Sequence, residues 1–387
     1  MRKKFQIILF IISIIIHIFF YISANWTHTL DMFFEHVTRG QDFFQIPNAA
    51  YAFLHGGTLT GNLPANIHPY TTCCGVNSNV YHPFFTLLIG MPLQFFAPWV
   101  AFSIWTFVHL LTTTILLFFL WNKFKSHRYI YLALSLFLVN SYHYYEIHHA
   151  QYHFLFNFFT IFFIYESIKN GDTKRAGLWL FLSLLVKPIG LLWILPLLLY
   201  KRFKTVAVGI GLYALFTLPF QMVPFGQYYL SNFISVVKLS FPTYNLYSLV
   251  HIIPSLPAEF IKITSYATAA LLIIFQLLKK PNLFLIIILW IFYQLLFYSL
   301  TFPYHYTILA GIFVLGLIFN IFTPKKILFL PVVLLTLPTP IVLFHLTGFP
   351  PSLPPKEYSM MALYSASLLI LLTLTILSKT YAKKIIK

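Results

Sequence analysis

The sequence has few carboxylates and few charged residues of any kind. Only 8 Asp and Glu accompany 25 Lys and Arg in 387 residues, and charged residues make up 9% of the chain. Hydrophobic residues make up 59%. A water-soluble core cannot accommodate so many long uncharged runs, so this composition excludes an ordinary soluble domain. The solvent for most of the chain is predicted to be lipid.

Cysteine is almost absent. Cys73 and Cys74 are the only two, and neighbouring residues rarely bridge each other because disulfide geometry needs a larger separation. No disulfide framework is therefore predicted. The net charge of +17 does not indicate a nucleic-acid partner, because the basic residues lie in short clusters between hydrophobic runs, which is a signal of membrane topology.

Uncharged runs of bilayer-spanning length recur along the chain. The first, Phe5–Ser23, follows the basic Arg2-Lys3-Lys4 and nearly spans a bilayer at about 1.5 Å per residue. A cleaved signal peptide is the competing interpretation, but the many later spans favour an uncleaved anchor. We predict an all-α polytopic membrane protein in which residues 1–387 form one integral-membrane domain.

The pair Lys187-Pro188 interrupts the apolar run Ala176–Tyr200. Proline disfavours helical structure at the residue before it and removes a backbone donor. The pair therefore predicts two half-length helices that meet at the lysine. When this hairpin counts as two crossings, the chain crosses the membrane about twelve times and both termini are cytoplasmic.

The placement of the basic residues favours this orientation. Lys187 then lies in the membrane and 20 of the 25 Lys and Arg are cytoplasmic, as the positive-inside rule requires. The basic residues left on the other face are Arg39, Lys238, Lys262 and Lys356. Two long polar connections, residues 24–83 and 224–259, share that non-cytoplasmic face. Any chemistry is expected there.

Asp42 is one of three acids in the connection 24–83. It precedes Phe43–Leu54, which we expect to form a helix along the membrane interface. A partly desolvated carboxylate at the lip of a membrane cavity can act as general base for a hydroxyl. The alternative is a helix cap or a surface salt bridge with Arg39, and spacing alone favours this alternative. The other two acids are interpreted as surface residues.

Lys187 is the second candidate. A charge near the bilayer centre costs about 2.5–3.5 kcal/mol on insertion scales. A cavity where the half-helices meet, with a phosphate or carboxylate partner for the ammonium, lowers that cost. The alternative is a lysine whose long side chain reaches the interface from a shorter span. The adjacent proline favours the functional interpretation.

The connection Tyr142–His153 is rich in histidine. His143, His148, His149 and His153, with Glu146, could suggest a metal site. Adjacent histidines cannot share one helical face and no cysteine joins them, so hydrogen bonding in an interfacial turn is the favoured interpretation. We predict no metal and no other cofactor.

Four groups of short motifs follow one another through most of residues 30–310. They are Asp42-Phe43-Phe44 with Gly56-Gly57 and Tyr81-His82-Pro83-Phe84; Ala150-Gln151; Leu184-Leu185-Val186-Lys187-Pro188 with Lys201-Arg202; and Asn245-Leu246-Tyr247-Ser248-Leu249 with Tyr304-His305-Tyr306. In order and spacing they resemble glycosyltransferase family 87, the polyprenol-phosphate-mannose-dependent mannosyltransferases of the C-type membrane fold. Ala150 stands where that family has glycine.

The resemblance implies transfer of a sugar from a polyprenyl-phosphate donor to a hydroxyl of a glycan or glycolipid, with inversion. It implies that Asp42 is the catalytic base and that His305 belongs to the active site. The donor phosphate needs cations or hydrogen-bond donors nearby, and the candidates are Lys187, His305, Arg39 and Lys238. The residues expected to line the cavity or bind the acceptor are Gln151, Asn245, Tyr304 and Tyr81. Membrane lipids are expected to surround the protein.

Two other classes of protein fit parts of the sequence. A transporter or flippase of lipid-linked saccharides suits a broken helix with a buried lysine, but the chain has no obvious repeat and its polar sequence lies on one face. A non-catalytic assembly factor explains the topology but gives Asp42 and Lys187 no role. We expect a bacterial plasma membrane, with the endoplasmic reticulum as the alternative, and an active site on the non-cytoplasmic face.

Overall fold

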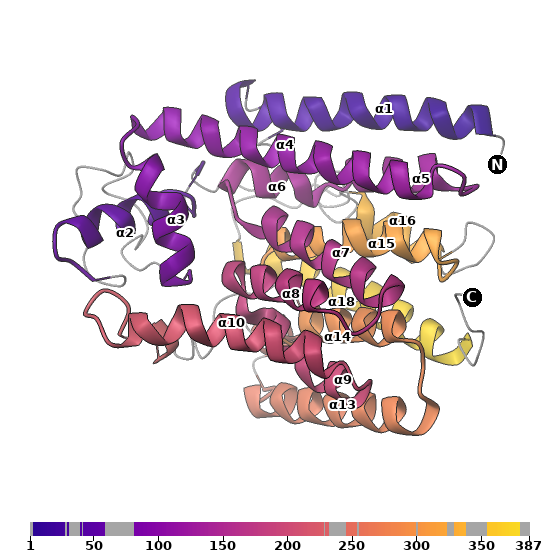
Figure 1. Ribbon diagram of the computed structural model, residues 1–387. Coiled ribbons are helices and arrows are strands. Elements are labelled where there is room, and N and C mark those ends of the chain that lie inside the picture. The colour runs from indigo at the N-terminus through magenta and orange to yellow at the C-terminus, as the bar shows by residue number, and fades with distance from the viewer. Residues whose placement is uncertain are drawn as a thin grey trace.

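The computed structural model describes residues 3–27, 29–30, 39–40, 42–58, 81–227, 229–231, 245–253, 255–298, 301–322, 329–337 and 354–379. Every regular element in these ranges is a helix (Figure 1). The first half contains α1 (Lys3–Ile22), the π-helical turn η1 (Ser23–Thr27), α2 (Gln45–Leu54), α3 (Pro83–Leu93), α4 (Pro98–Phe124), α5 (Ile130–Leu138), α6 (Tyr142–His149), α7 (His153–Lys169) and α8 (Lys174–Val186). The second contains η3 (Pro188–Trp193), α9 (Ile194–Leu199), α10 (Phe203–Gln221), η4 (Leu246–Ser248), α12 (Leu249–Ile252), α13 (Ala258–Lys279), α14 (Leu283–Phe297), η5 (Pro303–Thr307), α15 (Ile308–Ile318), α16 (Phe329–Thr336) and α18 (Pro354–Lys379).

Four helices are long and apolar enough to cross a membrane: α1 continued by η1, α4, α10 and α13. Their outer faces carry large apolar side chains, such as Ile15 (61% exposed), Phe118 (64%) and Leu278 (73%). Such extensive apolar exposure is unfavourable in water but suits lipid, and a helix satisfies its own backbone groups there. The chain is therefore a helical membrane protein, as the composition predicts.

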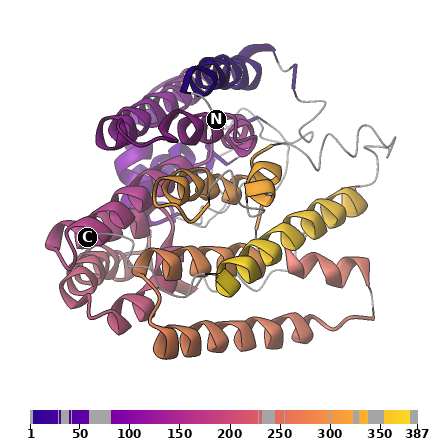
Figure 2. The ribbon, with the colours of Figure 1, turned by 90° about the vertical axis from the view of Figure 1, so that its right-hand side faces the viewer.

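Helices α14 and α15 lie in the interior of the bundle. Both are apolar on every side, and every residue of α15 is buried. A helix that is hydrophobic all round belongs in an interior rather than at a water-facing surface. Figure 2 shows α1 strongly foreshortened while α13 and α18 are seen lengthwise, so the helices do not run parallel to one another.

Helix α8 packs between α7 and α10. Gly177 permits the close approach of α8 to α10, because a Cβ there would lie 2.7 Å from the Val208 Cβ. The turn before α8 is fixed by Asp172, whose carboxylate accepts hydrogen bonds from the Lys204 and Thr205 N–H groups (3.0 and 2.8 Å). Slight burial acts to raise the pKa of Asp172, but these two backbone donors outweigh it and hold the pKa below its ordinary value.

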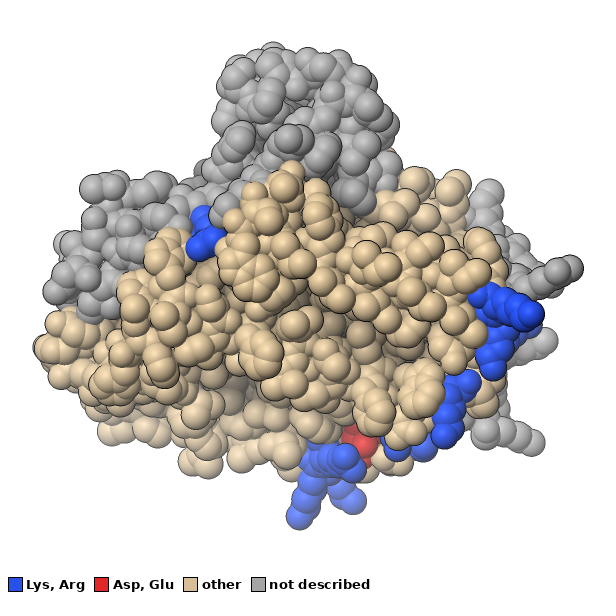
Figure 3. Space-filling model, turned by 90° about the horizontal axis from the view of Figure 1, so that it is seen from above, with Lys and Arg blue, Asp and Glu red and all other residues tan. Residues whose placement is uncertain are grey.

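Basic residues gather at one end of the long helices. Lys123, Lys169 and Lys279 each lie in the last turn of their helix, and α1 begins at the same right-hand end of the bundle (Figure 1). In Figure 3 the Lys and Arg lie mostly along the right and lower margins, and the middle of that face is uncharged. An uncharged middle is the surface that a membrane-embedded bundle requires.

The predicted break at Lys187-Pro188 is confirmed. Helix α8 ends at Val186, Lys187 is extended (φ −146°, ψ 119°), and the 3₁₀ helix η3 and the short α9 follow. Proline is tolerated at the first position of η3 because no hydrogen-bond donor is needed there. The Lys187 N–H still donates to the Ser183 carbonyl oxygen at 3.0 Å, so the break turns the chain without leaving that donor unsatisfied.

Two segments differ from the expectation. The histidine-rich connection Tyr142–His153 is not a turn throughout: it contains α6, and all eight residues of that helix are buried. Contacts with η1, α1 and η5 bury its rings, which a polar-looking composition does not reveal. The helix expected over Phe43–Leu54 is present as α2 but begins at Gln45, two residues late. Cys73-Cys74 and most of both long connections lie outside the described residues.

Gly90 allows α3 to pack tightly against α2. A Cβ on Gly90 would lie 2.6 Å from the Ile46 carbonyl oxygen and 2.8 Å from the Ala50 Cβ, so a larger residue forces the two helices apart. We expect Gly90→Ala to lower the free energy of unfolding by about 1–3 kcal/mol, measured as a lower thermal midpoint in detergent. The matched control is Gly211→Ala in α10, where a Cβ meets no atom within 4 Å. Equal loss in both variants would contradict the tight α2–α3 contact.

Candidate active site

A glycine turn just before α2 carries Asp42. Gly40 has a φ of +71°, and a Cβ there would lie 2.9 Å from both Phe102 and Phe44, so the turn requires glycine. The Gly40 N–H donates to the His148 carbonyl oxygen at 2.9 Å. The Asp42 turn is therefore joined directly to α6, about a hundred residues further along the chain.

Two phenylalanines anchor the turn on its other side. Phe43 and Phe44 are 0% and 1% exposed, and their rings pack against Phe102 and Trp105 of α4. The Tyr152 hydroxyl also donates to the Phe43 carbonyl oxygen at 3.3 Å. The Asp-Phe-Phe motif thus has a physical role: two buried rings fix the backbone from which the carboxylate projects.

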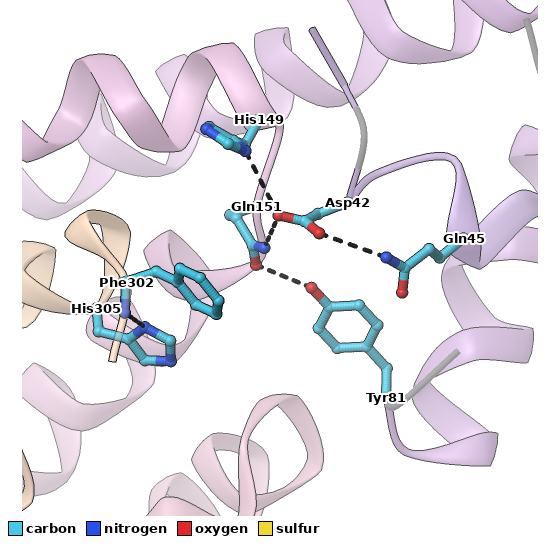
Figure 4. A network of polar contacts seen from close by, with 7 residues as sticks. All are labelled: Asp42, Gln45, Tyr81, His149, Gln151, Phe302 and His305. Carbon is cyan, nitrogen blue, oxygen red and sulfur yellow. Dashed lines mark hydrogen bonds and ion pairs between the residues drawn. The ribbon is translucent and has the colours of Figure 1, made fainter. Parts of the chain in front are cut away.

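The Asp42 carboxylate is held by three side chains but stays accessible (Figure 4). The Gln151 Nε2 donates to its Oδ2, the Gln45 Nε2 donates to its Oδ1 at 3.4 Å, and the His149 Nδ1 lies 3.6 Å from Oδ2. The Asp42 side chain is 20% exposed. A carboxylate that is oriented and still reachable can accept a proton from a hydroxyl.

The alternative role for Asp42, as a helix cap or a partner of Arg39, is not what the structure shows. The N-cap of α2 is Phe44, which makes no side-chain capping hydrogen bond. Within the described ranges, the ion-pair partner of Asp42 is His149. Arg39 instead stacks over Trp99 at 4.3 Å and donates from Nη1 to the Asn25 carbonyl oxygen at 2.6 Å.

Gln151 connects Asp42 to Tyr81. Ala150 ends α6 in the left-handed conformation (φ 49°, ψ 46°), and this change of direction presents Gln151 to the Asp42 turn. The Tyr81 hydroxyl donates to the Gln151 Oε1 at 2.8 Å, so the amide is oriented with Nε2 toward the carboxylate. Predicted site residues Asp42, Gln151 and Tyr81 are therefore brought together (Figure 4).

Lys187 lies against the ring of Tyr81, whose hydroxyl donates to Gln151. Its Nζ is 5.0 Å from the centroid of the Tyr81 ring, which is within cation–π range. The side chain is half-buried, and the carboxylates that act on its charge are Asp42 and Glu146. Tyr81 and Gln151 thus connect an accessible carboxylate, Asp42, to a half-buried ammonium, Lys187.

The predicted His305 and Tyr304 lie on η5, next to the same group. The Phe302 N–H donates to the His305 Nδ1 at 2.9 Å, so a neutral ring carries its proton on Nε2. The Tyr304 ring lies 5.8 Å from that of His149. His153 contacts both η5 residues, at ring distances of 4.3 Å to His305 and 5.1 Å to Tyr304.

Asn245 does not join the site. Asn245 donates from Nδ2 to the Tyr298 carbonyl oxygen at 2.6 Å and to the Thr301 hydroxyl at 2.9 Å, so it braces the segment leading to η5 rather than lining the Asp42 site. Lys238 lies outside the described residues. Arg39, as described above, has a packing role against α4.

The sequence does not predict two of the residues around Asp42. For His149 it indicates only hydrogen bonding in a turn, with a metal as the less favoured alternative, and it gives no indication of Gln45. One signal was available for His149, since it lies two residues before Gln151 in the Ala150-Gln151 motif. Two of the histidines of the Tyr142–His153 connection lie in different surroundings: His149 faces Asp42 and His153 faces His305.

Tyr81→Phe removes the hydroxyl that orients Gln151 but keeps the ring beside Lys187. We expect a loss of about 1–3 kcal/mol in the free energy of unfolding, because the buried Gln151 Oε1 loses its donor. The thermal midpoint in detergent is the measurement. Tyr266→Phe is the control, since Tyr266 is 72% exposed. If the two variants melt alike, Tyr81 does not orient Gln151.

Comparisons of the chain with protein-family models, with curated proteins and with solved structures found no match. The function therefore has to be inferred from the Asp42 site itself.

Proposed function

We propose that this protein is a membrane glycosyltransferase that moves a hexose, such as mannose, from a polyprenyl-phosphate donor to a hydroxyl of a glycan or glycolipid. The observation that carries the proposal is one accessible carboxylate, Asp42, near one half-buried ammonium, Lys187, with Tyr81 and Gln151 connecting the two. Inverting transfer needs a single base rather than the paired carboxylates of glycosidases.

In the proposed step, the acceptor oxygen attacks the anomeric carbon of the donor sugar. Its proton passes to Asp42 as the new glycosidic bond forms. The bond between the anomeric carbon and the phosphate oxygen breaks, and polyprenyl phosphate leaves with the electron pair. Gln151 and Gln45 support this role because they hold the carboxylate in one orientation while it stays accessible.

The leaving phosphate needs positive charge or hydrogen-bond donors, not a general acid. The Lys187 ammonium and the Nε2–H of neutral His305 are the candidate donors. The polyprenyl chain needs an apolar surface, and the exposed faces of the long helices are apolar. These features together favour a lipid-phosphate donor over a nucleotide sugar.

We also propose the number of membrane crossings and their orientation. Twelve crossings, a C-type fold and cytoplasmic termini would place Asp42 on the non-cytoplasmic face of a bacterial plasma membrane. Cysteine labelling tests this in a Cys73→Ser, Cys74→Ser background. A cysteine at position 55, in the turn after α2, should react with an impermeant reagent from outside, and one at position 127 should react only after the membrane is opened.

The activity test uses purified protein in lipid vesicles with a polyprenyl-phosphate hexose and a panel of glycan acceptors. The expected products are a new glycoside and an equal amount of polyprenyl phosphate. The alternative, a flippase, also suits a broken helix with a buried lysine, but it would move the donor between leaflets without releasing polyprenyl phosphate. Translocation without release would overturn the transferase proposal.

A further inference from the structure

A second group of titratable side chains lies in the interior of the bundle. His109 of α4 and His143 and Glu146 of α6 each offer one ligand atom, and these atoms all lie within 4.8 Å of one another. The three residues are 2%, 3% and 1% exposed. His109 and His143 contribute nothing to the candidate active site around Asp42, and Glu146 acts on it through the charge of Lys187.

The helical spacing explains two of these positions. His143 and Glu146 are three residues apart on α6, so their side chains share one face of that helix. His109 reaches the same point from α4. A histidine and a carboxylate three apart, joined by a ligand from another helix, form the kind of arrangement by which helix bundles hold metal ions.

A hydrogen bond gives His143 the tautomer that can bind a metal ion. Its Nε2 lies 3.0 Å from the Phe137 carbonyl oxygen and, as a donor to it, leaves the Nδ1 lone pair free. A backbone carbonyl that orients one ring nitrogen while the other binds is the usual second contact of a metal-bound histidine. His17 of α1 repeats the pattern, because its Nδ1 lies 3.2 Å from the Leu138 carbonyl oxygen.

The remaining ring nitrogens of these histidines have no hydrogen-bond partner among the described residues. They are both ring nitrogens of His109, Nδ1 of His143 and Nε2 of His17. The Glu146 carboxylate receives hydrogen bonds from the Thr307 hydroxyl and the Phe154 N–H. Buried polar atoms are nearly always satisfied, so four unpartnered ring nitrogens on three neighbouring histidines indicate a missing ligand.

We propose that His109, His143 and Glu146 bind a divalent transition-metal ion of the Zn²⁺ class, with His17 available as a fourth ligand. Two or three imidazoles and one carboxylate favour Zn²⁺, Co²⁺ or Fe²⁺ over the oxygen-preferring Mg²⁺ and Ca²⁺. A tetrahedral ion with bonds of about 2.1 Å holds its ligand atoms about 3.4 Å apart. The observed separations need to shorten by little more than about 1 Å.

The ion would join α6 to α4. His17 and His143 also contact each other, with ring centroids 5.1 Å apart, so α1 can be drawn into the same site. Three residues beyond Glu146 on α6, His149 faces Asp42. A bound ion therefore fixes the helix that carries a neighbour of the candidate active site, although metal binding itself does not depend on the proposed transferase activity.

The test is metal titration of the detergent-purified full chain, prepared with a tag that binds no metal and treated with a chelator. Co²⁺ is expected to bind at one ion per chain with visible d–d absorption bands, and Zn²⁺ should displace it. His143→Gln and Glu146→Gln should each weaken binding by more than about 100-fold, since loss of an outer-shell partner alone costs 10–100-fold. Millimolar Mg²⁺ should not compete.

The matched control is His148→Gln, a buried histidine of the same helix that lies outside the group. It should leave Co²⁺ binding unchanged. All variants are first checked for a monodisperse elution profile, and His109→Gln gives a second ligand variant on another helix. Failure of the wild-type chain to bind Co²⁺ or Zn²⁺, or equal loss in His148→Gln and His143→Gln, would overturn the site.

Discussion

Asp42→Asn is expected to lower the turnover number for sugar transfer by about 10²–10⁴-fold, the contribution typical of general-base catalysis. The amide cannot take the proton of the acceptor hydroxyl, whereas its carbonyl oxygen can still accept the hydrogen bond from Gln151. The packing of Phe43 and Phe44 is untouched, so the fold and the Michaelis constant for the donor should change little. The measurement is initial-rate release of polyprenyl phosphate in lipid vesicles.

Glu259→Gln is the control for this variant. Glu259 lies in the first turn of α13 and is exposed. Its substitution by Gln therefore removes the same charge away from the site. This variant should transfer sugar at the wild-type rate. A folded Asp42→Asn protein that retains full transfer would remove Asp42 as the base, and only a loss specific to Asp42 supports the proposed step.

Some features of the fold could be predicted from the sequence because they depend on local chemistry. Proline restricts the residue before it whatever surrounds it, so the break at Lys187-Pro188 was readable from two residues. The helix α2 and the clusters of lysine at the ends of long helices are equally local features. Membrane character follows from composition alone.

Other features depend on contacts between distant helices, which no local pattern encodes. His109 lies in a long apolar helix where it resembles an isolated core histidine, and only the packing of α4 against α6 brings it to His143 and Glu146. Arg39 is the opposite case. It is close to Asp42 in sequence, but its side chain stacks on Trp99 instead. Proximity in sequence to Asp42 was therefore misleading for Arg39, and the position of His109 in the sequence gave no indication of its contacts.

The Asp42 site shows how these two kinds of information combine. The motifs Asp42-Phe43-Phe44, Ala150-Gln151 and Lys187-Pro188 are each degenerate, yet the structure joins one residue from each through Tyr81. Gln151 receives the Tyr81 hydroxyl and donates to Asp42, while Lys187 lies against the Tyr81 ring. A base and a cation connected in this way are expected to act on the two substrates of one reaction, the base on the acceptor and the cation on the donor.

Lys187→Met tests the cation end of this arrangement. Methionine keeps an unbranched apolar side chain against the Tyr81 ring but has no charge. Loss of one partner of a buried, charge-assisted contact costs about 2–5 kcal/mol, so kcat/KM for the polyprenyl-phosphate donor should fall by at least about 30-fold. The Michaelis constant for the acceptor should change by less than about threefold, because the acceptor meets Asp42.

The decisive measurement is whether Lys187→Met changes the kinetic constants for the donor alone or for the donor and the acceptor alike. Lys262→Met, at an exposed position of α13, removes the same charge outside the site and should leave both constants unchanged. Lys187→Arg should recover part of the donor dependence, since guanidinium also binds phosphate. If Lys187→Met leaves donor dependence intact, Lys187 does not contact the phosphate. If it weakens donor and acceptor equally, the break at Pro188 matters for structure and the leaving phosphate must be held by other donors, with the Nε2–H of His305 next to be tested.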